Sequence, residues 1–442
     1  MKKLITSIAI AFCLTVQAQT ITTVVGDGTQ GYSGDGGQAT AASLNYPISV
    51  VVDKNGNIFC SDDGNNVIRK ITTTGVITTY AGTGIYGYSG DGGQANLATL
   101  NDVRAMAINN KTGDLYLVNT DDYRIRKVSS TGVISTFAGN GVSGYSGDGG
   151  QATAAAIGWS EGIAIDTAGN VYFADEVNAV IRKIDVNGII TTFAGILGGG
   201  YSGDNGLAIN AQLSPVGLAA DAKGNLFIAD EGNRVIRKIN TNGIITTIAG
   251  TPGVEGFSGD GGAATLAELS GALQIAVDAY DNLFISDFMN SRIRYVNNAG
   301  IISTIAGNGT PGYAGDNGPA LQAEFTTLAG ICFNNNHLYI ADNRNYRIRK
   351  ITFASTEGIS HNSSLANQVS LYPNPNNGSF VVETAETEKQ TLQLFDVNGK
   401  LVLTQAINSK TNIDATNLAD GVYNLSLINA NGVINKRLVI VR

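Results

Sequence analysis

The chain has 442 residues, of which 43% are apolar, and its 28 basic and 36 acidic residues give a formal net charge of -8. No run of Lys or Arg is long enough to neutralise a phosphate backbone, so the composition disfavours nucleic-acid binding. Beyond the N-terminal apolar stretch, no segment has the ~20 continuous apolar residues that a transmembrane helix needs. The sequence therefore predicts a large folded protein without a transmembrane segment.

The N-terminus carries an export signal. Met1-Lys2-Lys3 precedes an apolar run from Leu4 to Val16, and Ala18 supplies a small residue for cleavage. This pattern predicts a signal peptide over residues 1–18. Cys60 and Cys332 then remain in the mature chain, either as buried thiols or as a disulfide pair.

A glycine phrase of the type Gly-Tyr-Ser-Gly-Asp-Gly-Gly recurs six times at steps of 56 or 57 residues. A fixed period of this size indicates an array of similar structural units that bury their apolar faces against one another. The aromatic positions of the six copies are Tyr32, Tyr88, Tyr145, Tyr201, Phe257 and Tyr313.

Four short strands are predicted in each unit. In the third unit they span residues 162–166, 170–175, 180–184 and 189–194, and each run is rich in β-branched residues and bounded by Gly, Asn or Asp. The last unit lacks a fourth strand after Thr352, whereas Ile21 to Val25 forms a strand with no earlier partner. We therefore predict an all-β, six-bladed β-propeller over residues 19–353, in which the N-terminal strand closes the last blade.

The repeat resembles the NHL-repeat propellers. The resemblance is carried by the glycine phrases, by Ala-Asp strand ends such as Asp175 and Asp230, and by the Ile-Arg-Lys type of strand. It implies a fold but no single activity, because this family includes protein-binding, RNA-binding and lyase members. The strand arginines are Arg69, Arg126, Arg182, Arg237, Arg294 and Arg349.

The repeat stops near Ala354. Residues 354–368 are polar and predict a linker, and residues 369–442 have a separate strand rhythm with a hairpin signal at Asn398-Gly399. The phrases that begin at Leu371, Leu392 and Leu418 resemble the type A sorting domain of the type IX secretion system. The resemblance implies a small β-sandwich, delivery by the type IX machinery through the outer membrane of a Gram-negative bacterium, and a secreted or cell-surface location. An adhesive immunoglobulin-like module is the alternative.

Two repeated features are expected to be structural. Each glycine phrase contributes one Asp, which we expect to cap the short helical turn that follows. A single carboxylate among glycines is a poor calcium site, because calcium needs six to eight oxygens. The strand arginines occur in every unit, so we expect them to pair between blades.

A ligand site should break the repeat, and the breaks occur where the chain enters the inner strands. Charged residues occur at these positions only in the second and third units. The single Trp of the chain lies in the same segment of the third unit. We predict a ligand site at one mouth of the central channel. Its residues are Tyr46, Asp102, Arg104, Trp159, Glu161 and Gln274. The alternative is that Arg104 and Glu161 only pair across blades while Trp159 plugs the channel.

Further departures from the repeat lie in the turns between second and third strands, at Tyr123, Phe288, Met289, Arg344 and Tyr346. Aromatic residues and Arg are enriched at contact surfaces, so these turns favour an interface on the same face. Drift in exposed loops is the alternative.

The sequence contains no convincing catalytic arrangement. Its two histidines, His337 and His361, are too few for a multi-His zinc centre, and no Ser-His-Asp triad is evident. We therefore predict a monomeric, cofactor-free protein that binds an extracellular protein, peptide or glycan. The alternative is a calcium-assisted lactonase, hydrolase or lyase that uses Asp102, Glu161, Asn45 and Asn101.

Overall fold

A computed structural model describes residues 19–353, 369–384, 390–395, 401–429 and 432–442. The predicted signal peptide and the predicted linker lie outside these ranges. The chain divides into two compact units, Met1–Phe353 and Ala354–Arg442, which are described separately.

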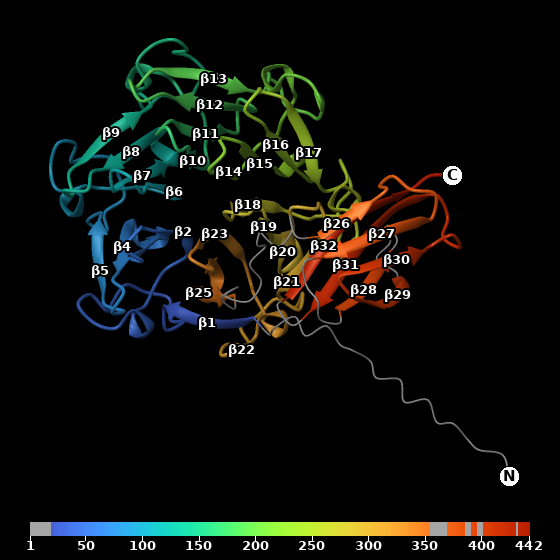
Figure 1. The fold of residues 1–442 in the computed structure, drawn as a ribbon. Helices are drawn as coiled ribbons and strands as arrows, with labels where there is room; N and C mark the ends of the chain where they lie inside the picture. Colours follow the sequence, from blue (N-terminus) through green and yellow to red (C-terminus); the bar gives the residue numbers. More distant parts are fainter. Residues whose placement is uncertain (1–18, 354–368, 385–389, 396–400, 430–431) are drawn as a thin grey trace. The chain divides into compact units, whose positions relative to one another are not determined.

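The first unit is a ring of six antiparallel sheets, as the repeat predicts (Figure 1). Neighbouring inner strands lie next to one another around the whole ring, and the last inner strand meets the first. In order from the axis outward, the first five blades are β2 (Pro47–Val52), β3 (Ile58–Asp62), β4 (Val67–Ile71) and β5 (Ile77–Ala81); β6 (Val103–Asn109), β7 (Asp114–Asn119), β8 (Arg124–Val128) and β9 (Ile134–Ala138); β10 (Ile163–Ile165), β11 (Val171–Asp175), β12 (Val180–Ile184) and β13 (Ile190–Ala194); β14 (Leu218–Ala220), β15 (Leu226–Asp230), β16 (Val235–Ile239) and β17 (Ile245–Ala249); and β18 (Ala272–Val277), β19 (Leu283–Asp287), β20 (Arg292–Val296) and β21 (Ile302–Ala306).

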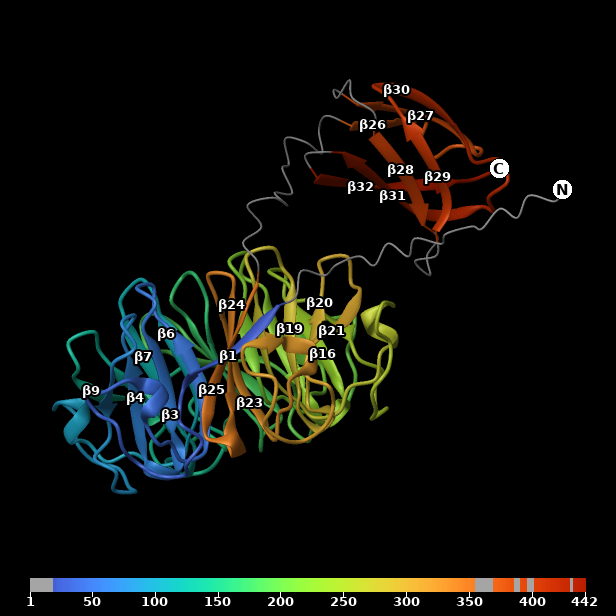
Figure 2. The same ribbon diagram turned by 90° about the horizontal axis from the view of Figure 1, so that it is seen from below.

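The sixth blade is completed by the N-terminal strand, which confirms the predicted closure. Strand β1 pairs antiparallel with β25, with Ile21 opposite Ile351 and Thr23 opposite Arg349. Figure 2 shows the blue β1 beside the orange β25. Pairing the two ends of the repeat removes the free edge that an open array would expose. The strands are β23 (Leu328–Asn334), β24 (His337–Asp342), β25 (Arg347–Thr352) and β1 (Thr20–Val25), and β22 (Gly318–Pro319) adds a short outer edge.

The core lies between blades rather than along the axis. One cluster joins Phe59 and Ile68 of the first blade to Met106 and Leu117 of the second, and each further pair of neighbours has its equivalent. Cys60 and Cys332 contribute to the cluster between the first and sixth blades as free thiols. Since each blade buries its faces only against its neighbours, the closed ring is needed to complete the core.

Short 3-10 helices occupy two recurring positions. Those that follow the glycine phrases are η1 (Ala39–Ala41), η3 (Ala95–Leu97), η5 (Ala152–Ala154), η6 (Ala208–Asn210), η8 (Ala264–Leu266) and η10 (Ala320–Gln322). Those in the turns between second and third strands are η2 (Asp63–Asn65), η4 (Thr120–Asp122), η7 (Glu231–Asn233), η9 (Phe288–Asn290) and η11 (Asn343–Asn345). The third blade has a plain turn at this second position.

The glycine phrase packs closely against the turn that follows it. Gly34 has φ +91°, and a Cβ there would lie 2.5 Å from the Cβ of Ala42. Only glycine combines this backbone conformation with so close an approach. The glycine at this position therefore recurs in all six phrases because the local geometry requires it.

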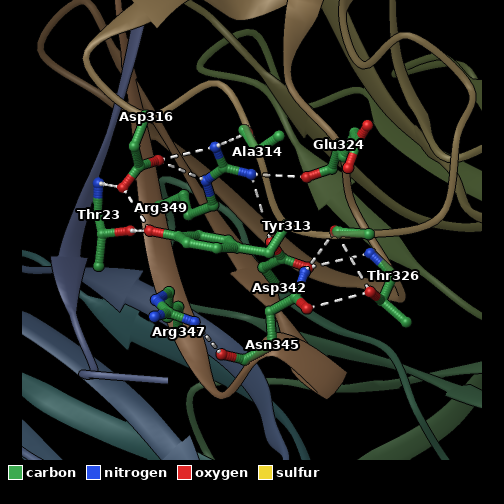
Figure 3. Close-up of polar contacts among 11 residues, drawn as sticks. Thr23, Tyr313, Ala314, Asp316, Glu324, Thr326, Asp342, Asn345, Arg347 and Arg349 are labelled. Carbon is green, nitrogen blue, oxygen red and sulfur yellow. Dashed lines mark hydrogen bonds and ion pairs between the residues drawn. The ribbon is translucent and has the colours of Figure 1, made fainter.

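The repeated Arg and Asp residues form one ion-pair network per blade, and the six arginine side chains are fully buried. In the sixth blade, Arg349 binds Asp316 at 2.7 Å and lies 3.5 Å from Asp342 (Figure 3). The second carboxylate oxygen of Asp316 accepts the backbone N–H of Thr23 at 3.0 Å. The other five arginines bind the Asp of their own glycine phrase at 2.6 to 2.9 Å.

This network corrects two predictions. The Asp of the glycine phrase does not cap the helical turn, whose N-cap side chains make no capping hydrogen bond. Its carboxylate instead joins the third strand to the outer strand, as Asp35 does with Arg69 and the N–H of Thr79. The prediction that the strand arginines pair between blades is also wrong. Both carboxylate partners of Arg69 belong to its own repeat unit. A buried guanidinium needs partners within reach on every side, and its own unit supplies them.

The second unit is a two-sheet β-sandwich around its own apolar core. One sheet has the order β26-β27-β30 and the other the order β29-β28-β31-β32. Strands β28 and β29 pair antiparallel, as a hairpin requires, and the predicted turn at Asn398-Gly399 lies outside the described residues. The strands are β26 (Val369–Tyr372), β27 (Ser379–Thr384), β28 (Gln390–Phe395), β29 (Leu401–Ile407), β30 (Lys410–Asp414), β31 (Gly421–Asn429) and β32 (Gly432–Ile440).

Candidate functional site: the mouth of the propeller

Five of the six predicted site residues form one connected network, which we call the mouth. Arg104 lies between two carboxylates, with Nε 2.6 Å from Oδ1 of Asp102 and Nη1 3.2 Å from Oε1 of Glu161. Trp159 donates its indole N–H to the same Glu161 oxygen at 3.3 Å, and its ring faces the Arg104 guanidinium at 5.6 Å. The second and third blades are thereby joined by side chains that the other repeat units lack.

Gln274 reaches this network from the fifth blade. Its side-chain amide donates to the backbone carbonyl of Glu161 at 2.8 Å. The equivalent positions of the other blades hold small residues, namely Ser49, Ala105, Gly162, Gly217 and Gly330. Below this level, an axial cavity of about 180 Å³ is lined by all six inner strands, and Gln274 is part of that lining. Gln274 therefore lies between the mouth and the channel.

Tyr46, the sixth predicted residue, has a different partner. Its ring packs edge-on against Tyr346, with centroids 5.4 Å apart. Tyr346 belongs to the turn after η11, so this pair extends the mouth towards the sixth blade. The structure thus brings Tyr46 to an aromatic contact rather than into the Arg104 network.

Two residues of the mouth adopt a left-handed backbone conformation. Asp102 has φ +32° and Tyr46 has φ +50°, at equivalent positions of the second and first blades. The fifth blade places Gly271 there, with φ +65°. Left-handed conformations cost a non-glycine residue about 1 kcal/mol or more, and such residues concentrate at functional sites. Asp102 and Tyr46 are therefore held in place at an energetic cost that Gly would avoid.

Two further carboxylates, which the sequence interpretation missed, border the mouth. Asp63 and Glu176 are the first residues after the buried Asp that ends the second strand. The N–H of Glu176 donates to the carbonyl of Trp159 at 3.0 Å, which fixes its turn against the mouth. A sequence signal existed, because the residue after that Asp is acidic in three units, at Asp63, Glu176 and Glu231.

Burial and mutual repulsion perturb these two carboxyl groups. Burial, followed by the charge of Asp102, raises the pKa of Asp63 to about 7. Burial, followed by the charge of Glu161, raises the pKa of Glu176 to about 9. The charge of Arg104 opposes both shifts but does not cancel them. The mouth therefore contains more carboxyl groups than its single guanidinium can neutralise.

Arg104 itself stays charged. Burial lowers its pKa, but the hydrogen bond and charge of Asp102 and the charges of Glu161 and Asp63 outweigh that effect, so the net pKa is raised. A guanidinium that is fixed by two carboxylates is a rigid, planar group with defined donors. About a third of its side chain remains exposed, so a ligand can reach it.

The residues suggested for calcium are bonded to other groups of the protein. Asp102 and Glu161 both bind Arg104. The Asn45 side chain is used in bonds to Gln30 and Asn65, and Asn101 accepts a hydrogen bond from Asn119 at 3.3 Å. Within the described ranges, no group of three or more His, Cys, Asp or Glu side chains is placed to hold a metal ion.

The turns that depart from the repeat do open on the mouth. A Cβ on Gly271 would lie 3.1 Å from side-chain atoms of both Phe288 and Met289. Val177 and Met289 in these turns are largely exposed, as is Tyr86. Tyr86 also donates its hydroxyl to Asp121 at 2.9 Å. The rim is therefore partly apolar, whereas the centre is charged.

Comparisons with known proteins agree with this architecture. Residues 18–88, 140–199 and 198–258 match the family model described as the teneurin NHL domain, and residues 370–441 match the secretion system C-terminal sorting domain. Teneurin-4 of Mus musculus is 27% identical over 421 residues, which cover 84% of this chain but 14% of the relative. The chain thus spans about one seventh of the length of such relatives.

Solved structures share the propeller fold. An auxiliary nutrient binding protein from Bacteroides thetaiotaomicron aligns with a TM-score of 0.56 and 18% identity, over 75% of this chain and 76% of that chain. A protein of the same description from Bacteroides ovatus aligns with a TM-score of 0.56 and 16% identity, over 76% of each chain. At these identities the likeness shows the fold alone.

These findings define a class of protein: an exported β-propeller with a sorting tail. More particularly, the chain is an NHL-repeat six-bladed propeller followed by a type IX secretion system C-terminal sorting domain, as predicted. Such a tail directs the protein to the extracellular space or the cell surface. In the part of the chain that the structure describes, no helix is both long and apolar enough to span a membrane.

Proposed function

We propose that this exported propeller is a noncovalent binding protein, and that its ligand is an extracellular molecule held at the mouth. The observation that carries the proposal is the break in repeat symmetry, which joins Arg104, Trp159, Glu161 and Gln274 from three blades into one network. A network that served only stability would be expected in all six blades, as the buried arginines are.

The chemistry of the mouth supports recognition. It combines a half-buried aromatic ring, a partly exposed guanidinium and an amide with carboxylates. Ligand sites commonly combine apolar surface with a few fixed polar groups. The names of the auxiliary nutrient binding proteins, whose propellers share this fold, are in line with a binding role.

Trp159→Ala tests the proposal. A panel of peptides and oligosaccharides is first screened against the isolated propeller by thermal shift, because a ligand that binds the native state raises the melting temperature. For any ligand found, Trp159→Ala should weaken binding by about 2 kcal/mol or more, since buried aromatic anchors dominate many interfaces.

The matched control is Tyr280→Ala, which removes an exposed aromatic side chain from a turn between first and second strands. It should leave affinity unchanged. If Trp159→Ala instead lowers the free energy of unfolding by about 3–5 kcal/mol and affinity is unaltered, Trp159 is a core plug and the proposal fails.

The sorting tail is tested separately. Removing residues 366–442 should leave a folded propeller that is made and exported to the periplasm but is no longer displayed or released, as fractionation of the native host would measure. Normal surface display of this truncated protein would show that the tail is not the sorting signal.

A further inference from the structure

The face of the propeller opposite the mouth carries two neighbouring cavities. The mouth lies where the chain enters the inner strands, whereas these cavities border the turns in which the inner strands end. One, of about 270 Å³, lies between the first and second blades, and the other, of about 280 Å³, borders the second, third and fourth blades. Ile108 and Asn110 line both, so the turn between β6 and β7 stands between the two cavities.

The turn between β6 and β7 breaks the repeat. Six residues separate the paired Ile108 and Leu115, whereas five separate the paired Val52 and Ile58 of the first blade. In the other four blades of the described propeller the equivalent turn is no longer than in the first. The extra residue accounts for the single 57-residue step of the repeat. An exception to the repeat therefore coincides with the two cavities, as another exception does with the mouth.

The cavity between the first and second blades contains two lysines, and Lys70 is held in place by aromatic rings. Its half-buried ammonium group lies 5.5 Å from the ring centre of Phe59 and 5.7 Å from that of Tyr80. Cation–π contacts fix an ammonium group without neutralising its charge. Neither Lys70 nor Lys54 forms an ion pair with a described residue, whereas Lys127, the equivalent of Lys70 in the second blade, lies 4.0 Å from Asp114. Two positive charges of this cavity therefore lack a carboxylate partner.

The carboxylates that line the cavities are occupied by their own turns. Oδ1 of Asp53 accepts the backbone N–H groups of Asn55 at 2.9 Å and Asn57 at 2.8 Å, and Oδ2 accepts the Asn57 amide at 2.7 Å. Asp166 and Asp221 of the second cavity are bonded in the same way. The groups that remain for a ligand are the two ammonium groups and a set of amides and hydroxyls whose side chains make no hydrogen bond to a described residue. These are Asn55, Tyr80, Asn110 and Ser130.

This set of groups matches a molecule that is both acidic and rich in hydroxyls. Amides and hydroxyls donate and accept hydrogen bonds, as sugar hydroxyls do, and ammonium groups bind carboxylates through charge-assisted hydrogen bonds. None of the largely exposed apolar side chains of the protein lines either cavity, so an apolar peptide side chain would find no partner there. Two cavities on either side of one turn suit a chain of similar units better than a single small ion.

We propose that the paired cavities form a second ligand site, which binds an acidic oligosaccharide made of uronic acid units. Carboxylates of the sugar bind Lys54 and Lys70, and its hydroxyls bind the amides of Asn55 and Asn110. The site lies at the other end of the channel from Trp159, so the inference does not depend on the function proposed for the mouth.

The test compares tetragalacturonate with its methyl ester, which keeps the sugar rings and removes the charge. Binding of each to the full chain is measured by calorimetry up to millimolar ligand, at low and at high salt. The acid should bind at least about tenfold more tightly than the ester, because charge-assisted hydrogen bonds are the stronger ones. Its affinity should fall as salt is added, since partly exposed charges are screened.

Lys70→Met and Lys54→Met should each weaken binding of the acid by about fivefold or more, since each removes one charge pair across the interface. The matched control is Lys183→Met. Lys183 occupies the position of Lys70 in the third blade, lies 5.7 Å from the ring centre of Tyr172 and lines neither cavity. Its variant should bind within about twofold of the wild type, as expected for a distant exposed charge. Lys54 is exposed, so Lys54→Met keeps the test valid if Lys70→Met does not fold.

The outcomes separate this site from the mouth. Trp159→Ala should leave binding of tetragalacturonate unchanged, and a loss of affinity in that variant would place the sugar at the mouth and overturn the second site. Equal binding of acid and ester, no binding of the acid at millimolar concentration, or an equal loss in Lys183→Met would also overturn it. Tighter binding of hexaglutamate than of tetragalacturonate would show a site for acidic peptides and overturn the carbohydrate class.

Discussion

The propeller contains two kinds of arginine–carboxylate network, and their differences are informative. The first kind recurs in all six blades around fully buried arginines such as Arg349, each of which meets the Asp of its own glycine phrase. The second occurs once, at the mouth, where Arg104 is a third exposed and carboxyl groups are in excess. Charge that is balanced, buried and repeated stabilises the blade, whereas charge that is unbalanced, accessible and unique is suited to recognition.

Backbone geometry does not separate the two regions. Tyr46 and Asp102 adopt positive φ at the mouth, but residues other than glycine also adopt positive φ before the third strand of every blade, as at Asn66 and Arg234.

The largest effect is expected from opening the ring. Deleting residues 19–26 removes β1, its pairing with Arg347–Thr352 and the bond from Thr23 to Asp316. The sixth blade would expose an unpaired edge and part of its core, so the deletion should lower the free energy of unfolding by several kcal/mol. Urea unfolding of the isolated propeller measures this. A midpoint close to that of the intact ring would contradict the role of β1.

A smaller but still large effect is expected within the repeated network. Arg349→Met leaves Asp342 and Asp316 without their guanidinium, and breaking a buried pair from one side typically costs about 3–5 kcal/mol. Arg104→Met, the matched change at the mouth, should cost less, because water reaches its carboxylates. Urea unfolding of both variants compares the two networks directly. Equal decreases in the free energy of unfolding would contradict the difference between them.

The third prediction concerns pH. The pKa of Glu176 is raised from 4.5 to about 9 in the folded state, so the folded protein binds this proton more tightly than the unfolded chain does. The associated stability is present below about pH 4.5 and is lost as pH rises to about 9. Glu176→Gln should therefore become progressively more stable than the wild type across this window, as melting temperatures against pH would show. A constant difference would mean that Glu176 is not buried among like charges.

Most of the fold could be predicted from the sequence because the same strand pattern recurs in six repeat units. The strands predicted for the third unit coincide with β10 to β13 within two residues at each end. The orphan strand at Ile21 also identified the closing partner correctly, since an unpaired strand must find an edge. The role of the repeated Asp residues was predicted wrongly. A side chain such as Asp35 could cap a nearby helix or bind a distant arginine, and the spacing in the sequence does not distinguish these two roles.

The mouth was predictable only in part. Residues that stand out from the repeat, such as Arg104, Trp159 and Glu161, were found because the alignment of six units exposes any exception. Asp63 and Glu176 were missed, because acidic residues in turns are common and their burial beside Asp102 and Glu161 depends on which blades meet around the axis. Tyr46 was placed in the right region, but its contact with Tyr346 was not predicted, since that contact follows from closure of the ring.

The sequence by itself determined the number of blades, the strand that closes them, the sorting tail and the position of the exceptional residues, because each depends on local pattern and repetition. The tertiary structure decided which charges are neighbours. Residues 57 positions apart, such as Arg104 and Glu161, come within 3.2 Å only when successive blades pack side by side, and Gln274 reaches Glu161 from 113 residues away only across the closed ring. Electrostatic energy depends on distance and burial, neither of which the order of residues records.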